Sequence, residues 1–267
     1  MKSNFFYMQM FTWMFITYGS VSVSFAAPAP IITSTQDRAD AEDNSFGIGL
    51  TSSIAQRPFV GVDDQRASLI YLSYRYKRFY IEGLDIGFNV LKDKTYSLDV
   101  VGTPRFYEVE PAFADNGELD GIDQTKRTYL GGLSAQIKTN FAVYTVQLLH
   151  DLVESDGNEL VGQASKALKL NSDFTLTPSI GLVYQDSNLV DHFYGVQSHE
   201  VTVGRSQYSG KGSINVNATL HSSWNITKHI ELLGQLKYEV LGDGITDSPI
   251  VDEESIYSFT LGAVYRF

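Results

Sequence analysis

Apolar and polar residues alternate with a period of two along the last segment of the chain. Its apolar positions are Tyr257, Phe259, Leu261, Ala263, Tyr265 and Phe267. The positions between them are mostly small or polar, such as Ser258 and Thr260. Because successive side chains of a strand point to opposite faces, this pattern predicts a strand with one apolar face that ends on an aromatic residue.

The same alternation recurs upstream with decreasing clarity. Three segments have about the ten residues that a tilted strand needs to cross a bilayer; they are residues 174–184, 213–224 and 230–240. Weaker segments are residues 46–50, 70–77, 84–90, 96–100, 129–138, 142–148 and 160–170. In the last of these, Lys166 falls on the apolar face.

These segments predict an all-β fold, an antiparallel transmembrane β-barrel. Eleven segments are visible in the sequence, whereas single-chain bacterial barrels normally have an even number of strands. We therefore expect about 12 strands, with 10 as the alternative. The missing strand is expected within residues 69–90 or 196–205.

The connections fit a barrel, which joins its strands by short turns at the periplasmic end and longer loops at the outer end. Tight polar turns are expected at residues 139–140, 171–172 and 225–228. Longer links are expected at residues 108–126, 153–158, 186–208 and 242–254. Counted back from the last strand, the long links all fall at the outer end, and this order fails only upstream of residue 108.

The first residues differ from the rest of the chain. Lys2, an apolar run and the small residues before Ala27 have the three regions of a secretory signal peptide. A membrane anchor is the alternative, but polar residues interrupt the run, which is shorter than the ~20 apolar residues of a spanning helix. We expect residues 1–26 to be a signal peptide cleaved after Ala26, residues 27–43 a flexible periplasmic lead-in, and residues 44–267 the barrel.

Composition excludes several classes of function. The formal net charge is −11, which argues against nucleic-acid binding, because phosphates require Lys and Arg to replace their counterions. The absence of Cys excludes disulfides, thiol nucleophiles and thiolate metal sites.

No pattern of residues points to catalysis, a cofactor or a metal, and we expect a protein that is not an enzyme. The acids at residues 243–254 lack the spacing and glycine of an EF-hand, so a solvated loop is the favoured interpretation. Asp151 follows His150, but neighbouring strand residues point to opposite faces and cannot cooperate. The many Tyr and Phe residues could stack on sugars, but at strand ends they fit the aromatic girdles of a barrel better.

Several short strings resemble the MipA/OmpV family of outer-membrane proteins and are spread over nearly the whole chain after residue 56. They are residues 57–63 (RPFVGVD), 77–80 (KRFY), 176–181 (LTPSIG), 192–196 (HFYGV), 247–252 (DSPIVD) and 265–267 (YRF). The resemblance implies an integral barrel in the outer membrane of a Gram-negative cell. It also implies a scaffold role, in which the barrel joins a murein lytic transglycosylase to a penicillin-binding protein.

Two other functions stay open from the sequence. Polar residues on the inner faces fit a small-solute channel, or porin, and the long links fit a surface adhesin or receptor. The candidate binding residues of the outer loops are Asp191, His192, Phe193, Tyr194, Asp247 and Asp252. The last strand, with Tyr257, Phe259, Leu261, Tyr265 and Phe267, is the expected signal for the barrel assembly machinery, as the resemblance to outer-membrane barrels implies.

Overall fold

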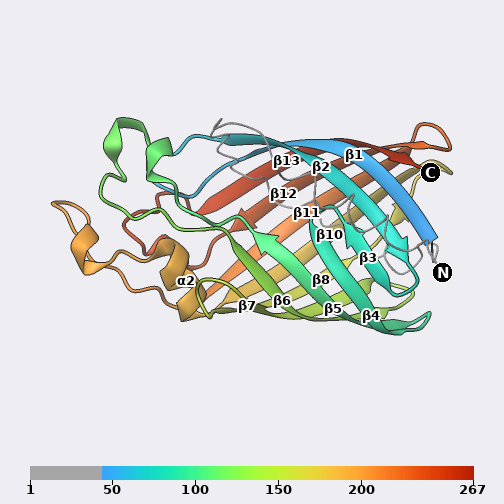
Figure 1. Ribbon diagram of the computed structural model, residues 1–267, viewed down its shortest axis with the longest axis horizontal. Helices are drawn as coiled ribbons and strands as arrows, with labels where there is room; N and C mark the ends of the chain where they lie inside the picture. Colours follow the sequence, from blue (N-terminus) through green and yellow to red (C-terminus); the bar gives the residue numbers. More distant parts are fainter. Residues whose placement is uncertain (1–43) are drawn as a thin grey trace, which may run out of the picture.

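The computed structural model describes residues 44–267, which form a closed barrel of antiparallel strands (Figure 1). The expected signal peptide, its cleavage site after Ala26 and the lead-in lie outside the described residues. The strands are β1 (Asn44–Ala55), β2 (Gln65–Tyr76), β3 (Phe79–Glu82), β4 (Asp85–Lys92), β5 (Tyr96–Arg105), β6 (Thr128–Lys138), β7 (Val143–Asp151), β8 (Asn158–Ser165), β9 (Leu168–Lys169), β10 (Phe174–Gln185), β11 (Ser213–Asn225), β12 (Ile230–Val240) and β13 (Ser255–Arg266).

The barrel closes because β1 pairs with β13 as well as with β2. Both β8 and β9 pair with β10 in one register, so together they form a single interrupted strand, and the barrel of the described residues has 12 strands. The interruption lies opposite Pro178, whose carbonyl accepts a bond from the Lys166 backbone N–H at 3.1 Å. Proline has no N–H to return that bond, which explains the gap in the ladder.

The strand that the alternation misses is β3, inside the crowded stretch of residues 69–90. It has 4 residues and pairs with β2 and β4. With β3 counted, the strand number is the expected 12, and the links alternate between the two ends along the whole barrel. The β3–β4 link, residues 83–84, is the exception in length, because it is a short turn on the side of the long loops. The short β3–β4 hairpin makes the wall lower here. Above it, Arg57 donates to the carbonyl oxygens of Phe106 (2.6 Å) and Glu108, and so ties two loops together.

The alternation predicted from the sequence is confirmed in the strands. Large apolar side chains on the outer surface are exposed, as for Ile70, Leu220 and Leu236. Their polar neighbours, such as Thr219 and Gln235, are buried in the lumen. The expected girdle aromatics are all on the outer surface: Tyr129, Tyr184, Trp224, Tyr238, Tyr257 and Tyr265.

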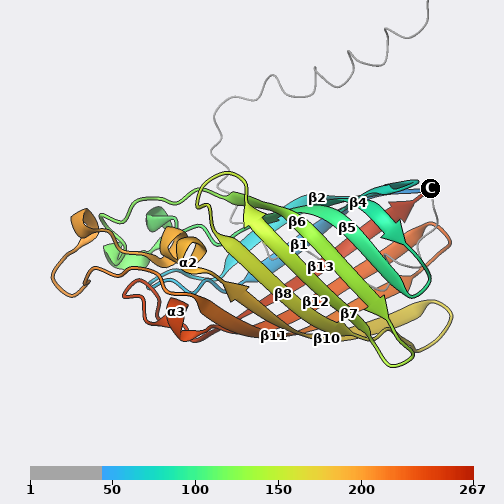
Figure 2. The ribbon, with the colours of Figure 1, turned by 90° about the horizontal axis from the view of Figure 1, so that it is seen from below.

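The long loops gather at one end of the barrel, which we term the loop end (Figure 2). They carry α2 (Ser187–Tyr194), α3 (Asp243–Thr246) and the 3-10 helices η1 (Pro111–Phe113), η2 (Asp115–Gly117) and η3 (Ser198–Glu200). No helix within residues 44–267 is long and apolar enough to span a membrane.

These loops pack on one another rather than standing free in solvent, and we call the assembly the cap. The cap has an apolar core drawn from four of the loops and from the top of the barrel. Its buried residues include Phe59, Val109, Leu119, Ile122, Leu189, Val190, Phe193, Tyr194, Val196, Ile245, Ile250 and Val251. The acids Asp243, Asp247, Asp252 and Glu254 are exposed, as the interpretation of a solvated loop expects. The sequence did not show that apolar side chains between these acids are buried against distant loops.

Candidate functional site

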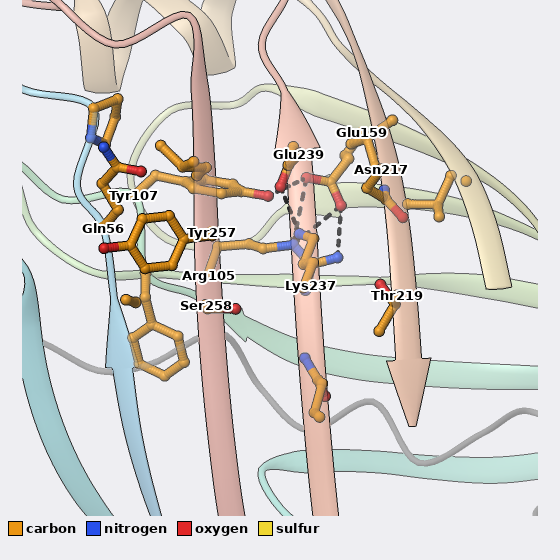
Figure 3. Close-up of a pocket in the computed structure, with 18 of the residues that line it drawn as sticks. Gln56, Arg105, Tyr107, Glu159, Asn217, Thr219, Lys237, Glu239, Tyr257 and Ser258 are labelled. Atoms are coloured by element: carbon orange, nitrogen blue, oxygen red, sulfur yellow. Dashed lines mark hydrogen bonds and ion pairs between the residues drawn. The ribbon is translucent and has the colours of Figure 1, made fainter. Parts of the chain in front are cut away.

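A cavity of about 150 Å³ lies inside the barrel beneath the cap (Figure 3). Strands β7, β8 and β10 to β13 supply most of its wall. The rest comes from the ends of β1 and β5, from the two loops that follow these strands, and from Tyr194 of α2. The wall is lined by inward-facing side chains that alternate with the apolar belt of the same strands. We treat this cavity as the candidate functional site.

Two ion pairs stand in the cavity wall. The guanidinium of Arg105 contacts the Glu159 carboxylate at 2.5 Å and 3.0 Å, in a two-pronged arrangement. Glu159 also accepts bonds from Tyr107 (3.3 Å) and Gln185 (3.4 Å). The buried Glu159 carboxylate therefore has the hydrogen-bond partners that a charged group needs when water cannot reach it.

The second pair joins neighbouring inward positions of β12. Lys237 Nζ lies 2.5 Å from Glu239 Oε2, and Asn215 Nδ2 donates to Glu239 Oε1 at 3.2 Å. Glu239 is buried and Lys237 half-buried. Each of the two carboxylates in the wall is therefore matched by its own cation.

The roof of the cavity is aromatic and belongs to the cap. Phe59 and Tyr194 stack with ring centroids 5.6 Å apart, and Tyr107 joins them in lining the cavity. Burial, followed by the nearby Glu159, raises the pKa of Tyr107 well above its usual range. Burial likewise raises the pKa of Tyr194. Both phenols therefore stay neutral at physiological pH.

Hydrogen-bonding side chains form the remaining wall. Gln147 and Gln163 donate to Ser134 (3.4 Å) and Ser179 (3.0 Å). Gln235 Oε1 and Thr145 Oγ1 are buried and have no hydrogen-bond partner among the described residues. An unpaired buried polar atom costs ~1–3 kcal/mol. The wall of the cavity therefore has at least two polar atoms whose hydrogen-bonding capacity is not used by the protein.

At the other end of the barrel, which we term the turn end, side chains fill the lumen. Tyr71, Leu233 and Val264 form a small buried apolar cluster. Beside them Arg266 Nη2 contacts Glu231 Oε2 at 2.5 Å, and Arg266 Nη1 donates to Ser73 at 3.1 Å. The cavity thus lies between the cap and a packed layer.

The candidate residues of the outer loops fall into two groups. Phe193 and Tyr194 are buried in the cap core, and Tyr194 reaches the cavity. Asp191 accepts a bond from the Gly210 N–H at 2.7 Å, and so fixes a loop. Asp247 pairs with Lys211 at 3.7 Å on the surface. Asp252 and His192 are not part of the cavity wall, and ligand binding by the outer loops stays a prediction.

The residues of the last strand lie as the alternation predicts. Tyr257, Phe259, Leu261 and Tyr265 are on the outer surface, and the C-terminal Phe267 is exposed. The ring of Phe267 lies 5.0 Å from that of Phe46. Recognition by the assembly machinery stays a prediction.

Sequence reasoning missed the pairing of Arg105 with Glu159, because the two residues are 54 positions apart and only the strand register brings them together. It also missed a small cluster on the cap, in which His199 Nε2 lies 3.0 Å from Asp123 Oδ2. Glu200 completes that cluster, but its two oxygens accept backbone N–H groups of Asp123 (2.7 Å) and Gln197 (2.6 Å). The bond to Asp123 joins two cap loops, and the bond to Gln197 caps the 3-10 helix η3.

Comparison with known proteins identifies the family. The family model described as "MltA-interacting protein MipA" matches residues 48–267. The chain belongs to the MipA family. The resemblance inferred from the short strings is thereby confirmed.

Relatives of this chain include proteins named as outer-membrane proteins. YiaT of Escherichia coli (strain K12), described as an outer membrane protein, is 24% identical over 231 residues, which cover 86% of this chain and 94% of YiaT. The MltA-interacting protein of the same strain is 24% identical over 230 residues, covering 84% and 91%. Outer membrane protein OmpV of Vibrio cholerae is 26% identical over 149 residues, covering 56% and 58%. The chain is an outer-membrane β-barrel.

Proposed function

We propose that this barrel is a scaffold that holds peptidoglycan-remodelling enzymes, a lytic transglycosylase and a penicillin-binding protein, at the outer membrane. The name of one relative states an interaction with MltA. The observation in this chain that supports the proposal is the charge of the turn end, which faces the periplasm in barrels of this type.

Apart from the Arg266–Glu231 ion pair, the turns of that end and the strand ends beside them carry eight basic residues and two acids, Asp93 and Asp173. We call the eight the basic rim; they are Lys77, Arg78, Lys92, Lys94, Lys138, Lys166, Lys169 and Lys228. All but Lys138 are exposed. The loops of the opposite end contain eighteen acids and five basic residues, a net charge of −13. Such segregation attracts and orients a partner with an acidic surface.

Binding of a purified murein lytic transglycosylase to the barrel in nanodiscs of neutral lipid tests the proposal. Changing Lys77, Lys92 and Lys169 together to Glu is expected to weaken binding at least tenfold, because attraction becomes repulsion. The matched control changes Lys126 and Lys211, both exposed at the loop end, to Glu and leaves binding within twofold. Equal binding by all three proteins would contradict docking through the basic rim.

A small-solute channel is the second candidate, and the polar cavity favours it. Against it, the described part of the barrel has the cap above the cavity and the packed layer of Tyr71, Leu233 and Val264 below it. Twelve strands enclose a lumen narrower than that of a 16-stranded porin. We expect no stable open level in planar bilayers. Regular single-channel steps would overturn the scaffold as the main function.

A further inference from the structure

The cavity beneath the cap has the chemistry of a binding site, and this is independent of docking at the basic rim. It is far larger than the ~10–15 Å³ that one water molecule needs. Apart from its ion pairs, its polar wall offers amide, hydroxyl and imidazole groups. These are Thr145, Gln147, Gln163, Asn217, Thr219, His221 and Gln235.

Three of these groups have hydrogen-bonding capacity to spare. Gln235 Oε1 and Thr145 Oγ1 are buried and unpartnered among the described residues, and the two residues are 3% and 2% exposed. The ring of His221, which is also buried in the lumen, forms no hydrogen bond with any residue in the described range. A ligand with hydroxyl or amide groups would supply the missing hydrogen-bond partners and so remove the cost of leaving these buried polar atoms unpaired.

The charges of the wall select against a charged guest. Glu159 is held by Arg105, and Glu239 by Lys237. Arg57 also lines the cavity, but its guanidinium donates to two loop carbonyls. A charged guest would lose its hydration without gaining a free counter-charge, so the loss of hydration would not be offset.

The roof offers the opposite kind of surface. Phe59, Tyr107 and Tyr194 bring aromatic rings to the cavity, above a wall of amides and hydroxyls. A ligand that fits both has an apolar face and a hydroxylated edge. Sugar rings have this form, with C–H groups on their faces and hydroxyl groups around their edges.

We propose that the cavity binds one neutral sugar unit or a polyol of similar size, with its hydroxyl groups on Gln235, Asn217 and His221 and its apolar face against the aromatic roof. The site is formed by strands that come together only when the barrel closes. It therefore exists only in the folded protein and is absent from the denatured chain.

Calorimetric titration of the purified full-length protein in detergent tests this proposal. The ligands are glucose, galactose, N-acetylglucosamine and glycerol, with glucosamine and glucuronate as charged counterparts. At least one neutral compound is expected to bind, and its charged counterpart at least tenfold more weakly. Failure of every neutral compound to bind, or equal binding of the charged ones, overturns the proposal.

Substitutions inside and outside the cavity wall test whether the ligand binds in the cavity rather than elsewhere in the lumen. Gln235→Leu and Asn217→Leu are each expected to weaken binding at least tenfold. The matched control is Gln136→Leu: Gln136 also faces the lumen, is 5% exposed and has an unpartnered Nε2, but lies outside the cavity wall. It should leave affinity within twofold. Equal losses in Gln235→Leu and Gln136→Leu would show a general effect on the barrel and refute the assigned site, while transglycosylase binding reports separately on the scaffold.

Discussion

At the scale of the residue, glycines decide where large side chains can stand in the lumen. Tyr80 of β3 pairs with Gly87 of β4, and its ring lies where a Cβ of residue 87 would be, 2.1 Å from Tyr80 Cζ. Tyr80 is only 1% exposed. The missing side chain of Gly87 therefore lets an aromatic ring lie flat against the barrel wall.

This contact predicts a difference between two glycines of the barrel. Gly87→Ala should destabilise the barrel by about 1–3 kcal/mol, because the added methyl displaces the Tyr80 ring. A Cβ at Gly162 would meet no atom within 4 Å, so Gly162→Ala should be neutral or slightly stabilising through reduced chain entropy. Urea unfolding in detergent micelles measures both. Similar losses in the two variants would contradict the role given to Gly87.

Neighbouring residues of β12 should also respond oppositely to charge. Leu236 is 52% exposed on the outer surface, whereas Gln235 is 3% exposed and faces the lumen. Leu236→Arg should lower stability by roughly 2 to 4 kcal/mol if the position is near the midplane of the membrane, since lipid cannot solvate the charge. Gln235→Arg should cost less, because amide, hydroxyl and carboxylate oxygens of the lumen can accept hydrogen bonds from the new guanidinium, whereas lipid offers no acceptor. Unfolding in lipid vesicles distinguishes them, and equal effects would mean that the two faces are wrongly assigned.

At the scale of the element, alternation identifies strands only when they are long enough to show a period. The four residues of β3 are too few, and Lys77, which precedes it, is included in the predicted segment that corresponds to β2. The gap between β8 and β9 likewise depends on Pro178 of another strand. The faces of strands were thus predictable from the sequence, whereas pairing defects that involve two strands were not.

Changes at the end of β13, the strand that closes the barrel, are expected to impair assembly in the membrane more than they impair the stability of the folded protein. The N–H of Phe267 donates to the Phe46 carbonyl at 3.0 Å, so the last residue takes part in the seam between β13 and β1. Deletion of Phe267, or Phe267→Asp, should reduce assembly in the outer membrane far more than it reduces the stability of protein already folded. Tyr265→Asp is the comparison, because both rings are exposed and lie 5.0 Å apart.

Heat-modifiable protein in outer-membrane fractions measures assembly of both variants. Recognition of the terminal residue predicts a larger loss for Phe267→Asp than for Tyr265→Asp. If the two losses are equal, Phe267 acts only as a girdle aromatic. Normal assembly of the Phe267 deletion would rule out its role in recognition.

At the scale of the whole molecule, the barrel has two kinds of packing. The strands are held by a closed ladder of backbone hydrogen bonds, whereas the cap is held by apolar side chains from loops far apart in the chain. Sequence reasoning could not find the cap core, because its side chains come from four separate loops that only the folded barrel brings together. For the same reason it could not foresee the cavity, whose roof comes from the cap and whose wall comes from the strands.

This division predicts that the cap can be loosened without opening the barrel. Phe193 is 1% exposed, and its ring lies 5.6 Å from that of Tyr107. Phe193→Ala should cost about 3–5 kcal/mol of local packing, while the strand ladder, which does not include Phe193, remains. Cleavage of the loops by proteinase K on intact cells should therefore increase at least tenfold, with the heat-modifiable mobility of uncleaved protein unchanged.

Val203→Ala is the control, because Val203 is fully exposed at a loop tip and its loss removes no packing. Loss of heat-modifiable mobility in Phe193→Ala would show instead that cap and barrel fold as one cooperative unit.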